Sequence, residues 1–356
     1  MNSFYKDKRI LVTGHTGFKG SWLCKTLVDL NANVFGVSLS KTKGGLYELL
    51  RLDGNVSSHF GDVNDLSFLK KCGYEIQPEI IFHLAAQPLV LEGIKNPVTT
   101  FHTNVMGVVN VLEVSRYLTS VKSCLIITTD KVYDLSGNLY SYKEIDPIGG
   151  KDPYSASKAA AEIIVNSYRE TYLSKDTPFS LATARAGNVI GGGDFSTDRI
   201  IPDCYNSILS KKQIKLRNPT HIRPWQHVIE PIFGYLILAK SIYHAWEYSG
   251  AYNFGPNYTE NYTVEHLAQK FCKYFDFEQI KTNHKSHNTI ESETLRIDST
   301  KSKELLGWYP ALDFERTIEW TAKWYKLLKE NQEVITETEN QIHEYKALIS
   351  NRGINI

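Results

Sequence analysis

The stretch Thr13-Gly14-His15-Thr16-Gly17-Phe18-Lys19-Gly20 decides the fold that this sequence predicts. It joins a short apolar run at 9–13 to a segment of helical period at 20–30, and a glycine-rich turn between a strand and a helix is the setting of a dinucleotide-binding site. Gly14 allows a tight turn, Gly17 lets backbone N–H groups approach a pyrophosphate at the helix N-terminus, and Gly20 permits close packing of helix on sheet. The alternative is three glycines in an ordinary strand-to-helix turn.

Short β-branched apolar runs alternate with segments of helical period through the first half of the chain. We expect strands at 9–13, 32–37, 80–84, 123–128 and 180–184, and helices at 20–30, 65–71, 100–119 and 154–172. This alternation predicts an α/β fold, a doubly wound parallel sheet of the Rossmann type. The predicted sheet domain covers 1–185.

The sequence changes character after about residue 185, where glycine-rich and proline-punctuated stretches and mixed short elements follow. The change predicts a smaller C-terminal substrate-binding lobe. We assign 186–224 and 256–330 to this lobe, a segment near 225–255 to the returning sheet domain, and 331–356 to a polar C-terminal tail without a role.

Composition excludes several classes of function. Among 356 residues, Lys and Arg number 40 and Asp and Glu 39, a net charge of +1, so binding of nucleic acid or of a membrane by bulk charge is not expected. No apolar run approaches the roughly 18 residues that a membrane span needs. The five cysteines are isolated and form no metal-binding pair, and no apolar segment of a secretory signal opens the chain. We therefore expect a cytoplasmic protein with reduced cysteines and no metal.

The choice between NAD and NADP is left open by the motif itself. About 20 residues beyond the glycines, where an acidic residue would hold the adenosine ribose, the sequence reads Phe35-Gly36-Val37-Ser38, followed by Lys41 and Lys43. The two lysines could meet a 2′-phosphate or simply be solvated. Asp62-Val63 would suit the adenine edge, with an ordinary acidic loop as the alternative.

Tyr154 and Lys158 open the longest expected helix, and their spacing of four places them on one face. An ammonium beside a phenol favours the phenolate, so Tyr154 can act as a general base toward a hydroxyl group. Lys158 can also hydrogen-bond a nicotinamide ribose. The spacing alone is a weak signal, and its place about 140 residues after the glycine motif strengthens it.

A third group of polar residues, Thr128-Thr129-Asp130-Lys131, follows the expected strand at 123–128. Ligands of doubly wound sheets lie beyond the carboxyl ends of the strands. Asp130 and Lys131 would be desolvated and opposite in charge there, a combination that can provide an acid and a base. A solvated turn is the alternative.

With these motifs in order, the sequence resembles the extended short-chain dehydrogenase/reductase family and, within it, the CDP-glucose 4,6-dehydratases, over about 9–325. The resemblance rests on the stretches at 13–23 (TGHTGFKGSWL), 82–90 (FHLAAQPLV), 103–107 (TNVMG), 129–133 (TDKVY), 184–194 (ARAGNVIGGGD), 217–219 (RNP), 223–228 (RPWQHV) and 253–256 (NFGP). His15, Phe18-Lys19 and Asp130-Lys131 distinguish this branch, because most sugar-nucleotide dehydratases have Thr-Asp-Glu at the last position and the epimerases have small residues.

The resemblance implies NAD-dependent conversion of CDP-D-glucose to CDP-4-dehydro-6-deoxy-D-glucose, a step of deoxysugar and surface polysaccharide biosynthesis. Tyr154 would take the C4 hydroxyl proton while hydride passes to NAD, and Thr129 would hydrogen-bond the C4 oxygen. Asp130 would protonate the departing C6 hydroxyl, and Lys131 occupies the position of the C5 base. Hydride would then return to C6. NAD is expected rather than NADP.

The resemblance also implies two sets of binding residues. The cofactor would contact Gly14, His15, Thr16, Gly17, Phe18, Lys19, Gly20, Asp62, Val63, Leu84, Ala85, Ala86, Gln87, Thr128, Tyr154 and Lys158. The nucleotide sugar would contact Gln87, Asn188, Arg199, Arg217 and Arg223, with Arg223 on the diphosphate. A homodimer or homotetramer is expected through the helices at 100–119 and 154–172.

Two departures from the family pattern concern the substrate. Leu91-Glu92 stands where the family has an arginine, and Tyr140-Ser141-Tyr142-Lys143-Glu144 replaces Trp-Gly-Tyr-Arg-Glu. A dehydratase for another nucleotide sugar therefore stays open. So does a 4-epimerase, against which Asp130-Lys131 argues, and a non-catalytic NAD-sensing regulator, against which the presence of Tyr154 and Lys158 argues.

Overall fold

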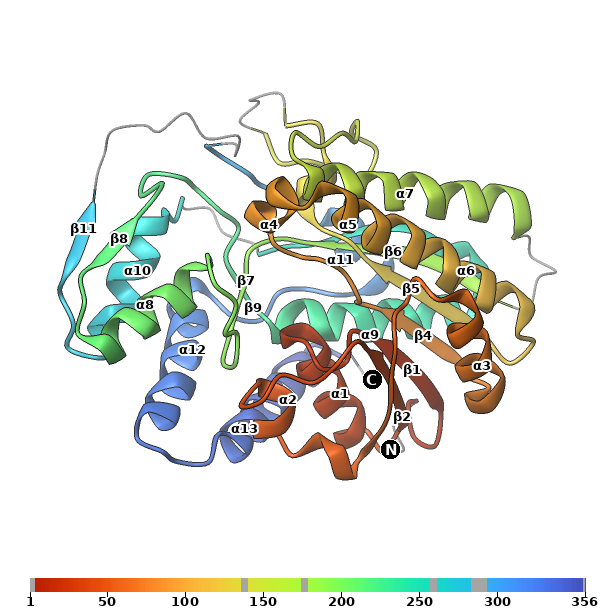
Figure 1. Ribbon diagram of the computed structural model, residues 1–356, viewed down its shortest axis with the longest axis horizontal. Helices are drawn as coiled ribbons and strands as arrows, with labels where there is room; N and C mark the ends of the chain where they lie inside the picture. The colour runs from red at the N-terminus through yellow and green to blue at the C-terminus, as the bar shows by residue number, and fades with distance from the viewer. Residues whose placement is uncertain (1–3, 136–139, 174–178, 257–260, 283–292, 355) are drawn as a thin grey trace.

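The computed structural model describes residues 4–135, 140–173, 179–256, 261–282, 293–354 and 356. At its centre lies a parallel sheet of seven strands in the order β10-β6-β5-β4-β1-β2-β3 (Figure 1). The strands are β1 (Arg9–Thr13), β2 (Asn33–Ser38), β3 (Val56–Phe60), β4 (Ile80–His83), β5 (Ser123–Ile127), β6 (Ser180–Ala186) and β10 (Gly250–Phe254). The predicted fold class, a doubly wound parallel sheet, is confirmed.

The helices flank the sheet and extend into a second region. They are α1 (Phe18–Asp29), α2 (Leu46–Leu49), α3 (Leu66–Ile76), α4 (Val90–Lys95), α5 (Pro97–Phe101), α6 (Gly107–Tyr117), α7 (Pro153–Tyr172), α8 (Ile200–Ser210), α9 (Ile229–His244), α10 (Val264–Lys273), α11 (Thr300–Leu306), α12 (Phe314–Lys329) and α13 (Val334–Ser350). Single 3-10 turns lie at Leu52–Gly54, Asp130–Val132 and Trp246–Tyr248, and a π-helical turn at His102–Met106.

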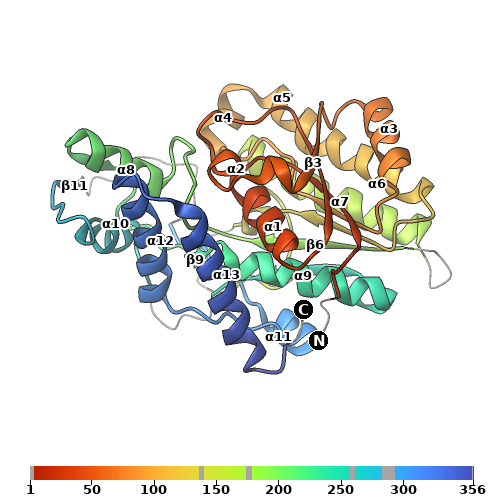
Figure 2. The ribbon, with the colours of Figure 1, turned by 90° about the horizontal axis from the view of Figure 1, so that it is seen from below.

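Two apolar cores form because successive side chains of a strand point to opposite faces of the sheet. On β1, Leu11 packs with α3, α6 and α7 on one face, whereas Ile10 and Val12 pack with α1 and α9 on the other. Figure 2 shows α1 and α9 on the face opposite to α3 and α6. The strands are consequently apolar on both sides, which is why they stand out in the sequence.

The structure departs from the expected elements at three places. The helix expected at 100–119 consists of α5, the π-helical turn and α6, and ends at Tyr117. Two strands of the sheet, β3 and β10, were not among those predicted. Strand β3 reads VSSHF and is only partly buried at the edge of the sheet, so it lacks the apolar run of a central strand.

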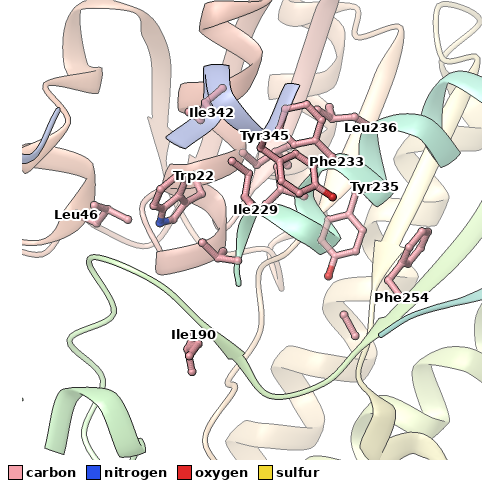
Figure 3. Packing of buried hydrophobic residues seen from close by; sticks show 14 of the residues in the cluster. Trp22, Leu46, Ile190, Ile229, Phe233, Tyr235, Leu236, Phe254, Ile342 and Tyr345 are labelled. Carbon is pink, nitrogen blue, oxygen red and sulfur yellow. The ribbon is translucent and has the colours of Figure 1, made fainter. Parts of the chain in front are cut away.

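The second region contains α8 and α10 and two small parallel pairs of strands. β7 (Val189–Ile190) pairs with β9 (Gln226–His227), and β8 (Ile214–Leu216) pairs with β11 (Ile280–Thr282). Its apolar residues belong to the same core cluster as α1 and α9, part of which Figure 3 shows. The second region and the sheet domain thus share one continuous core.

The segment 331–356, to which the sequence assigned no role, contains α13. This helix buries Val334, Ile342, Tyr345 and Ile349 in the core cluster that also holds Trp22 of α1 (Figure 3). Lys25 of α1 ties the two helices together, since its Nζ lies 2.7 Å from a carboxylate oxygen of Glu339. No helix among the described residues combines the length and apolar composition needed to cross a membrane.

Candidate functional site

The candidate site lies where β1, β4 and β5 end, next to the start of α7. The register places Thr13 at the end of β1 beside Val37 of β2 and His83 of β4. Because parallel strands end at one edge, the glycine turn after β1, the loop after β4 and the turn after β5 come together.

The glycine turn is packed too closely for side chains. Gly14 has a φ of +74°, and a Cβ there would lie 2.7 Å from the backbone nitrogen of Ala85; a Cβ on Gly20 would lie 2.1 Å from the carbonyl oxygen of Gly14. Gly17 precedes α1, and no side chain caps this N-terminus. Backbone N–H groups at an uncapped helix start suit a pyrophosphate, so the turn fits the expected dinucleotide.

His15 faces the sheet rather than the open side of the turn. Its Nδ1 is 2.9 Å from the Ser38 hydroxyl and its Nε2 is 2.9 Å from the Ser58 hydroxyl. Burial lowers the pKa of His15 to about 4, so the ring is neutral. A Cβ on Gly36 would overlap the ring, which explains a glycine inside β2. Thr16 continues this link, because its N–H donates to the Ser38 hydroxyl at 3.3 Å.

Lys19 contributes a charge to the site. Burial lowers the pKa of Lys19 to about 7, and its neighbours include the charged groups of Arg199, Asp130 and Lys158. Its Nζ lies 3.4 Å from the hydroxyl of Tyr235 on α9. The preceding Phe18 is half-buried against the main core.

The loop after β4 forms one wall of the site. Leu84, Ala85, Ala86 and Gln87 are all partly buried. The side chain of Gln87 is held within the protein, since its Nε2 donates to Thr100 Oγ1 at 2.8 Å and its Oε1 accepts from the N–H of Leu89 at 2.6 Å. It therefore shapes the wall in this structure.

The residue that holds Gln87 in place comes from the π-helical turn. Asn104 accepts from the Gln87 N–H at 2.8 Å and donates to the Ser157 hydroxyl at 2.9 Å. The wide turn thereby connects the β4 loop to α7. Asp62 and Val63 lie farther along the same edge, Asp62 exposed and Val63 buried, with Asn110 donating to the Val63 carbonyl at 2.9 Å.

The turn after β5 carries an unusual carboxylate. Asp130 is 1% exposed, and its Oδ1 accepts from Thr129 Oγ1 at 3.1 Å, whereas its Oδ2 has no hydrogen-bond partner in the structure. Burial raises the pKa of Asp130, against the opposing effects of Lys131, Thr129, Arg223 and Lys19. A carboxyl group whose pKa is raised holds its proton to higher pH, which suits a general acid.

Tyr154 reaches this turn from α7. Asp152 caps the helix by accepting from the Ser155 N–H at 3.0 Å, which fixes the first turn. Thr129 lowers and Asp130 raises the pKa of the Tyr154 phenol, so both residues lie close to it. Tyr154 thus lies beside the hydrogen-bonded pair of Thr129 and Asp130.

The electrostatics of the Tyr154 and Lys158 pair differ from the expectation. Burial raises the pKa of Tyr154 to about 12, whereas the spacing predicted a lowered value. Lys158 is 4% exposed and its Nζ donates to the Ile127 carbonyl at 3.0 Å, so it is engaged with β5. Burial lowers the pKa of Lys158 to about 8. Desolvation outweighs the attraction between the two groups in this structure.

Three of the residues expected to bind a nucleotide sugar either lie near Asp130 and Tyr154 or carry a buried polar atom without a hydrogen-bond partner. Arg223 is buried, donates to the Ile222 carbonyl at 2.9 Å and acts electrostatically on Asp130. Arg199 pairs with Asp194 at 3.0 Å and acts on Tyr154. Asn188 has a φ of +32° and a buried Oδ1 without a partner.

Arg217 does not join this group by any contact that the structure shows. It is exposed, and its guanidinium pairs with Asp198 at 3.3 Å. Thr128, at the end of β5, is buried and donates to Glu162 Oε1 at 2.5 Å.

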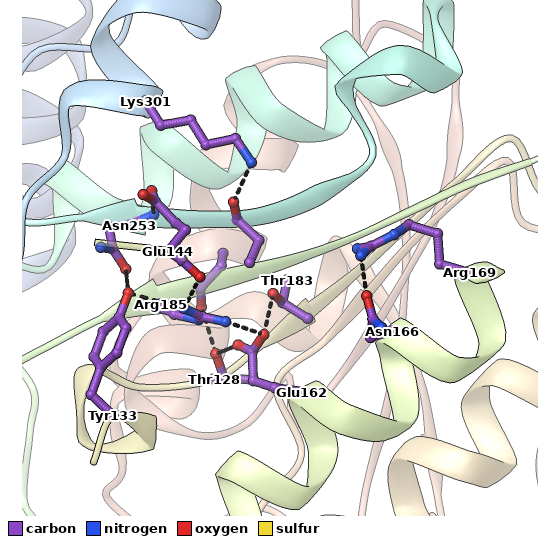
Figure 4. Close-up of polar contacts among 12 residues, drawn as sticks. Thr128, Tyr133, Glu144, Glu162, Asn166, Arg169, Thr183, Arg185, Asn253 and Lys301 are labelled. Carbon is purple, nitrogen blue, oxygen red and sulfur yellow. Dashed lines mark hydrogen bonds and ion pairs between the residues drawn. The ribbon is translucent and has the colours of Figure 1, made fainter. Parts of the chain in front are cut away.

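Sequence reasoning missed the buried network around Glu162, shown in Figure 4. Glu162 on α7 accepts from Thr128, from Thr183 at 2.7 Å and from Arg185 at 2.9 Å. Arg185 continues it to the Tyr133 hydroxyl at 3.0 Å. The available signal was a second charged residue four positions after Lys158, on the same face of the helix.

Comparisons with known proteins identify the family of the chain. Residues 11–321 match the family model described as GDP-mannose 4,6 dehydratase. The chain is 38% identical over 349 residues to a CDP-glucose 4,6-dehydratase of Salmonella typhimurium, covering 96% of this chain and 97% of the relative. It is 28% identical over 336 residues to a dTDP-glucose 4,6-dehydratase of Xanthomonas campestris, covering 88% and 92%.

Solved structures share the fold at lower identity. An epimerase of Methanothermobacter thermautotrophicus superposes with a TM-score of 0.79 at 23% identity, covering 92% of this chain and 94% of that one. A dTDP-glucose 4,6-dehydratase of Bacillus anthracis, solved with NAD, has a TM-score of 0.76 at 23% identity, covering 92% and 99%. The resemblance to the sugar-nucleotide dehydratases is confirmed by the sequence matches, and the chain belongs to the GDP-mannose 4,6-dehydratase family.

Proposed function

We propose that the protein is an NAD-dependent 4,6-dehydratase that converts CDP-D-glucose to CDP-4-dehydro-6-deoxy-D-glucose. The 38% identity to a CDP-glucose 4,6-dehydratase over nearly the whole chain supports the reaction and the nucleotide. Such a product belongs to the synthesis of deoxysugars.

One observation carries the reaction type. The buried Asp130 accepts a hydrogen bond from Thr129, both act on the pKa of Tyr154, and burial raises the pKa of the Asp130 carboxyl group, which favours its protonated form. Elimination of water from C5 and C6 needs an acid at the leaving hydroxyl, whereas inversion at C4 does not. The fold matches epimerases and dehydratases alike, so this acid is what separates the two functions.

Each residue of the site then has a defined role in the reaction. Tyr154 accepts the proton of the C4 hydroxyl while Thr129 hydrogen-bonds the same oxygen. Asp130 gives its proton to the departing C6 hydroxyl, and Lys131, the next residue, removes the C5 proton. Lys158 orients the cofactor ribose and stabilises the phenolate.

The cofactor supplies reversible oxidation of the sugar at C4. The turn of Gly14, Gly17 and Gly20 would hold its pyrophosphate, because no side chain caps the N-terminus of α1 and its backbone N–H groups can therefore bind an anion. Asp62 and Val63 would lie at the adenine and Leu84–Gln87 along the nicotinamide half. NAD is proposed over NADP because Lys41, the first cation after β2, is paired with Asp53 at 2.8 Å.

The nucleotide sugar would be held by Arg223, Arg199, Asn188 and Arg217, with Gln87 at the sugar. Arg223 is suited to the diphosphate, because its guanidinium is fixed by backbone carbonyls and lies within electrostatic reach of Asp130. The unpaired Oδ1 of Asn188 offers an acceptor to a sugar or ribose hydroxyl.

We also propose that the protein is a cytoplasmic homodimer or homotetramer assembled through α5, α6 and α7. Val98 and Phe101 on α5 and Ile163 on α7 expose large apolar side chains, 81%, 40% and 59% respectively. Apolar side chains gathered on neighbouring helices favour burial against another subunit. All five cysteines are free and buried, as suits a reducing compartment.

The function is tested by incubating the protein with NAD and, separately, CDP-, dTDP-, UDP- and GDP-glucose, followed by mass spectrometry. Loss of one water from CDP-glucose alone is the expected result. Loss of water from another sugar nucleotide would keep the mechanism and change the substrate. An unchanged mass with a C4-inverted sugar, detected by NMR, would show an epimerase and remove the role given to Asp130.

A further inference from the structure

A buried ion pair lies next to the candidate site, between Glu162 on α7 and Arg185 on β6 (Figure 4). The side chains are 4% and 5% exposed, and Arg185 Nη2 lies 2.9 Å from Glu162 Oε2. Buried charges persist only when they are paired and their remaining hydrogen-bonding capacity is used. Here the carboxylate also accepts from Thr183 at 2.7 Å and from Thr128 at 2.5 Å. Three donors face it, the arrangement that suits an ionised carboxylate.

Glu162 is linked to both segments that carry the proposed catalytic residues, the turn after β5 and the first half of α7. Thr128, which donates to it, directly precedes Thr129 and Asp130. Lys158 stands one helical turn before Glu162 on the same face of α7, and its Nζ donates to the carbonyl of Ile127 at 3.0 Å. The end of β5 is therefore fastened to α7 at two adjacent residues.

Glu162 is also the charge that opposes the effect of burial on Lys158. Burial lowers the pKa of Lys158 to about 8, and the Glu162 carboxylate is the group that raises it. Lys158 in turn lowers the pKa of Lys19 on α1, and burial lowers the pKa of His83 on β4 to about 3, so that ring is neutral. Arg185 lies on the other side of the carboxylate. Further titratable groups at the site are Tyr154, Asp130, Lys131, Arg199 and Arg223.

We propose that Glu162 is a positioning residue that keeps Lys158 an ammonium and holds Thr128, with the Thr129–Asp130 turn behind it, against α7. The role rests on the proposed function, in which Lys158 binds the cofactor ribose and favours the phenolate of Tyr154. A neutral Lys158 would lose the second of these effects entirely, since only a cation stabilises a phenolate by charge.

The direct test is the titration of Lys158 by NMR in protein labelled with ¹³C at lysine Cε, without cofactor or substrate. The Lys158 signal is assigned by its loss in Lys158→Met. We expect a midpoint near pH 8 in the wild type. In Glu162→Gln, which keeps the shape of the side chain and removes its charge, the midpoint moves down by about one unit or more.

Two control variants separate charge from packing. Thr183→Val removes one hydrogen bond to Glu162 and keeps the charge, so the Lys158 midpoint stays at its wild-type value. Glu230→Gln neutralises another fully buried carboxylate, on α9, which is bonded to Tyr345 and Leu312 rather than to the site. It too leaves the midpoint in place. A shift in either control as large as that in Glu162→Gln would overturn the proposal.

Two further outcomes also contradict it. One is a Glu162→Gln midpoint equal to that of the wild type. The other is a Lys158 midpoint near pH 6 or below in the wild type, because a buried lysine without a supporting charge has a pKa of roughly 5–6. This outcome needs only the wild type and so remains decisive if Glu162→Gln does not fold. A wild-type midpoint near pH 8 supports the proposal.

Kinetics supply a second readout. In Glu162→Gln we expect kcat to fall by at least about tenfold, the alkaline limb of its pH profile to move to lower pH, and KM for the nucleotide sugar to stay unchanged. A rise in KM with an unmoved pH profile would indicate general damage. If the wild type converts none of the four sugar nucleotides, the proposed function is wrong, but the titration of Lys158 can still be interpreted. If the wild type is active and the Lys158 midpoint is the same in Glu162→Gln, only the role of Glu162 is wrong.

Discussion

Gly187 packs so closely against the carboxyl group of Asp130 that no side chain fits between them. A Cβ on Gly187 would lie 1.7 Å from Oδ2 of Asp130. This oxygen has no hydrogen-bond partner in the structure. Space, more than hydrogen bonding, therefore fixes the orientation of the carboxyl group.

Gly187→Ala should displace Asp130 and impair the reaction. We expect kcat to fall at least about tenfold and the free energy of unfolding to fall by roughly 1–3 kcal/mol, because the new methyl group overpacks a buried position. Steady-state kinetics and denaturant unfolding measure the two effects. Gly54→Ala is the matched control, since a Cβ there meets nothing within 4 Å, and it should change neither quantity. Full activity in Gly187→Ala would show that the position of Asp130 is unimportant.

Asp130→Asn should separate oxidation from water loss. The amide keeps the shape and has no acidic proton to give, so dehydration should slow by about 10²–10⁴-fold. Oxidation at C4 does not need this acid, so the absorbance of reduced nicotinamide should appear when the sugar nucleotide is added. If dehydration and oxidation fell together, Asp130 would not be the acid of the elimination.

The pH dependence of dehydration follows from the same residue. Burial raises the pKa of Asp130, so the protonated form that acts as an acid persists above the usual range of a carboxyl group. Activity that depends on it is present below the raised pKa and is lost as the pH increases through it. A pH profile of kcat checks this, and the limb assigned to Asp130 should be absent from the residual activity of Asp130→Asn.

Glu230 makes stability depend on pH. Burial raises the pKa of Glu230 from 4.5 to about 7, so the folded protein favours the protonated form. Its contribution is fully present below about pH 4.5 and is lost as the pH rises through about 7. The loss amounts to roughly 3 kcal/mol. Denaturant unfolding from pH 4.5 to 7.5 should show a smaller decline in Glu230→Gln than in the wild type, and parallel curves would contradict the assignment.

Cofactor preference should respond to the pairing of Lys41 with Asp53. The Nζ of Lys41 lies 2.8 Å from Asp53 Oδ2, three residues beyond the end of β2. Asp53→Asn releases the cation, so the affinity for NADP relative to NAD should rise several-fold, measured by calorimetric titration at low ionic strength. Glu315→Gln, which breaks the remote exposed pair with Lys270, should leave the ratio unchanged. An unchanged ratio of NADP to NAD affinity in Asp53→Asn would show that the 2′-hydroxyl of the adenosine ribose does not lie near Lys41.

Val98 provides a test of association. It is 81% exposed on α5, so Val98→Asp should change the stability of an isolated subunit little, but it puts a charge into the proposed interface. Sedimentation should show a dimer or tetramer for the wild type and a smaller species for the variant. Leu305→Asp, at an exposed apolar residue of α11, should keep the wild-type assembly. A monomeric wild type would refute the proposed interface.

How far the sequence predicts the molecule depends on whether its signals are local. The strand Arg9–Thr13 has the bounds that the sequence predicts, because burial on both faces leaves a continuous apolar run. Strand β3 was missed, since an edge strand with two serines and a histidine carries no such run. The π-helical turn was missed as well. Its Asn104 is bonded to Gln87 and Ser157, which lie far away in the sequence, so no local pattern indicates the turn.

The candidate site shows the same division. The glycine motif and the Tyr154–Lys158 spacing are short-range patterns, and the sequence identifies them. The pKa of Tyr154 is not predictable from spacing, because it depends on how much of the fold surrounds the phenol. The same holds for His15, whose two hydroxyl partners lie at the end of β2 and in the middle of β3. Glu162 was passed over because its three donors come from β5 and β6.

The packing of α13 against α1 bears on the order in which the protein acquires its structure during synthesis. Arg51, just after α2, pairs with Glu333 at the start of α13, 282 residues later. The surface around α1 thus finds this partner only after α13 has been synthesised. Contacts of such long sequence separation are slow to form, and until then apolar surface of α1 and α9 stays open to water. The nascent chain is therefore a natural client for chaperones that shield apolar surface until α13 has packed.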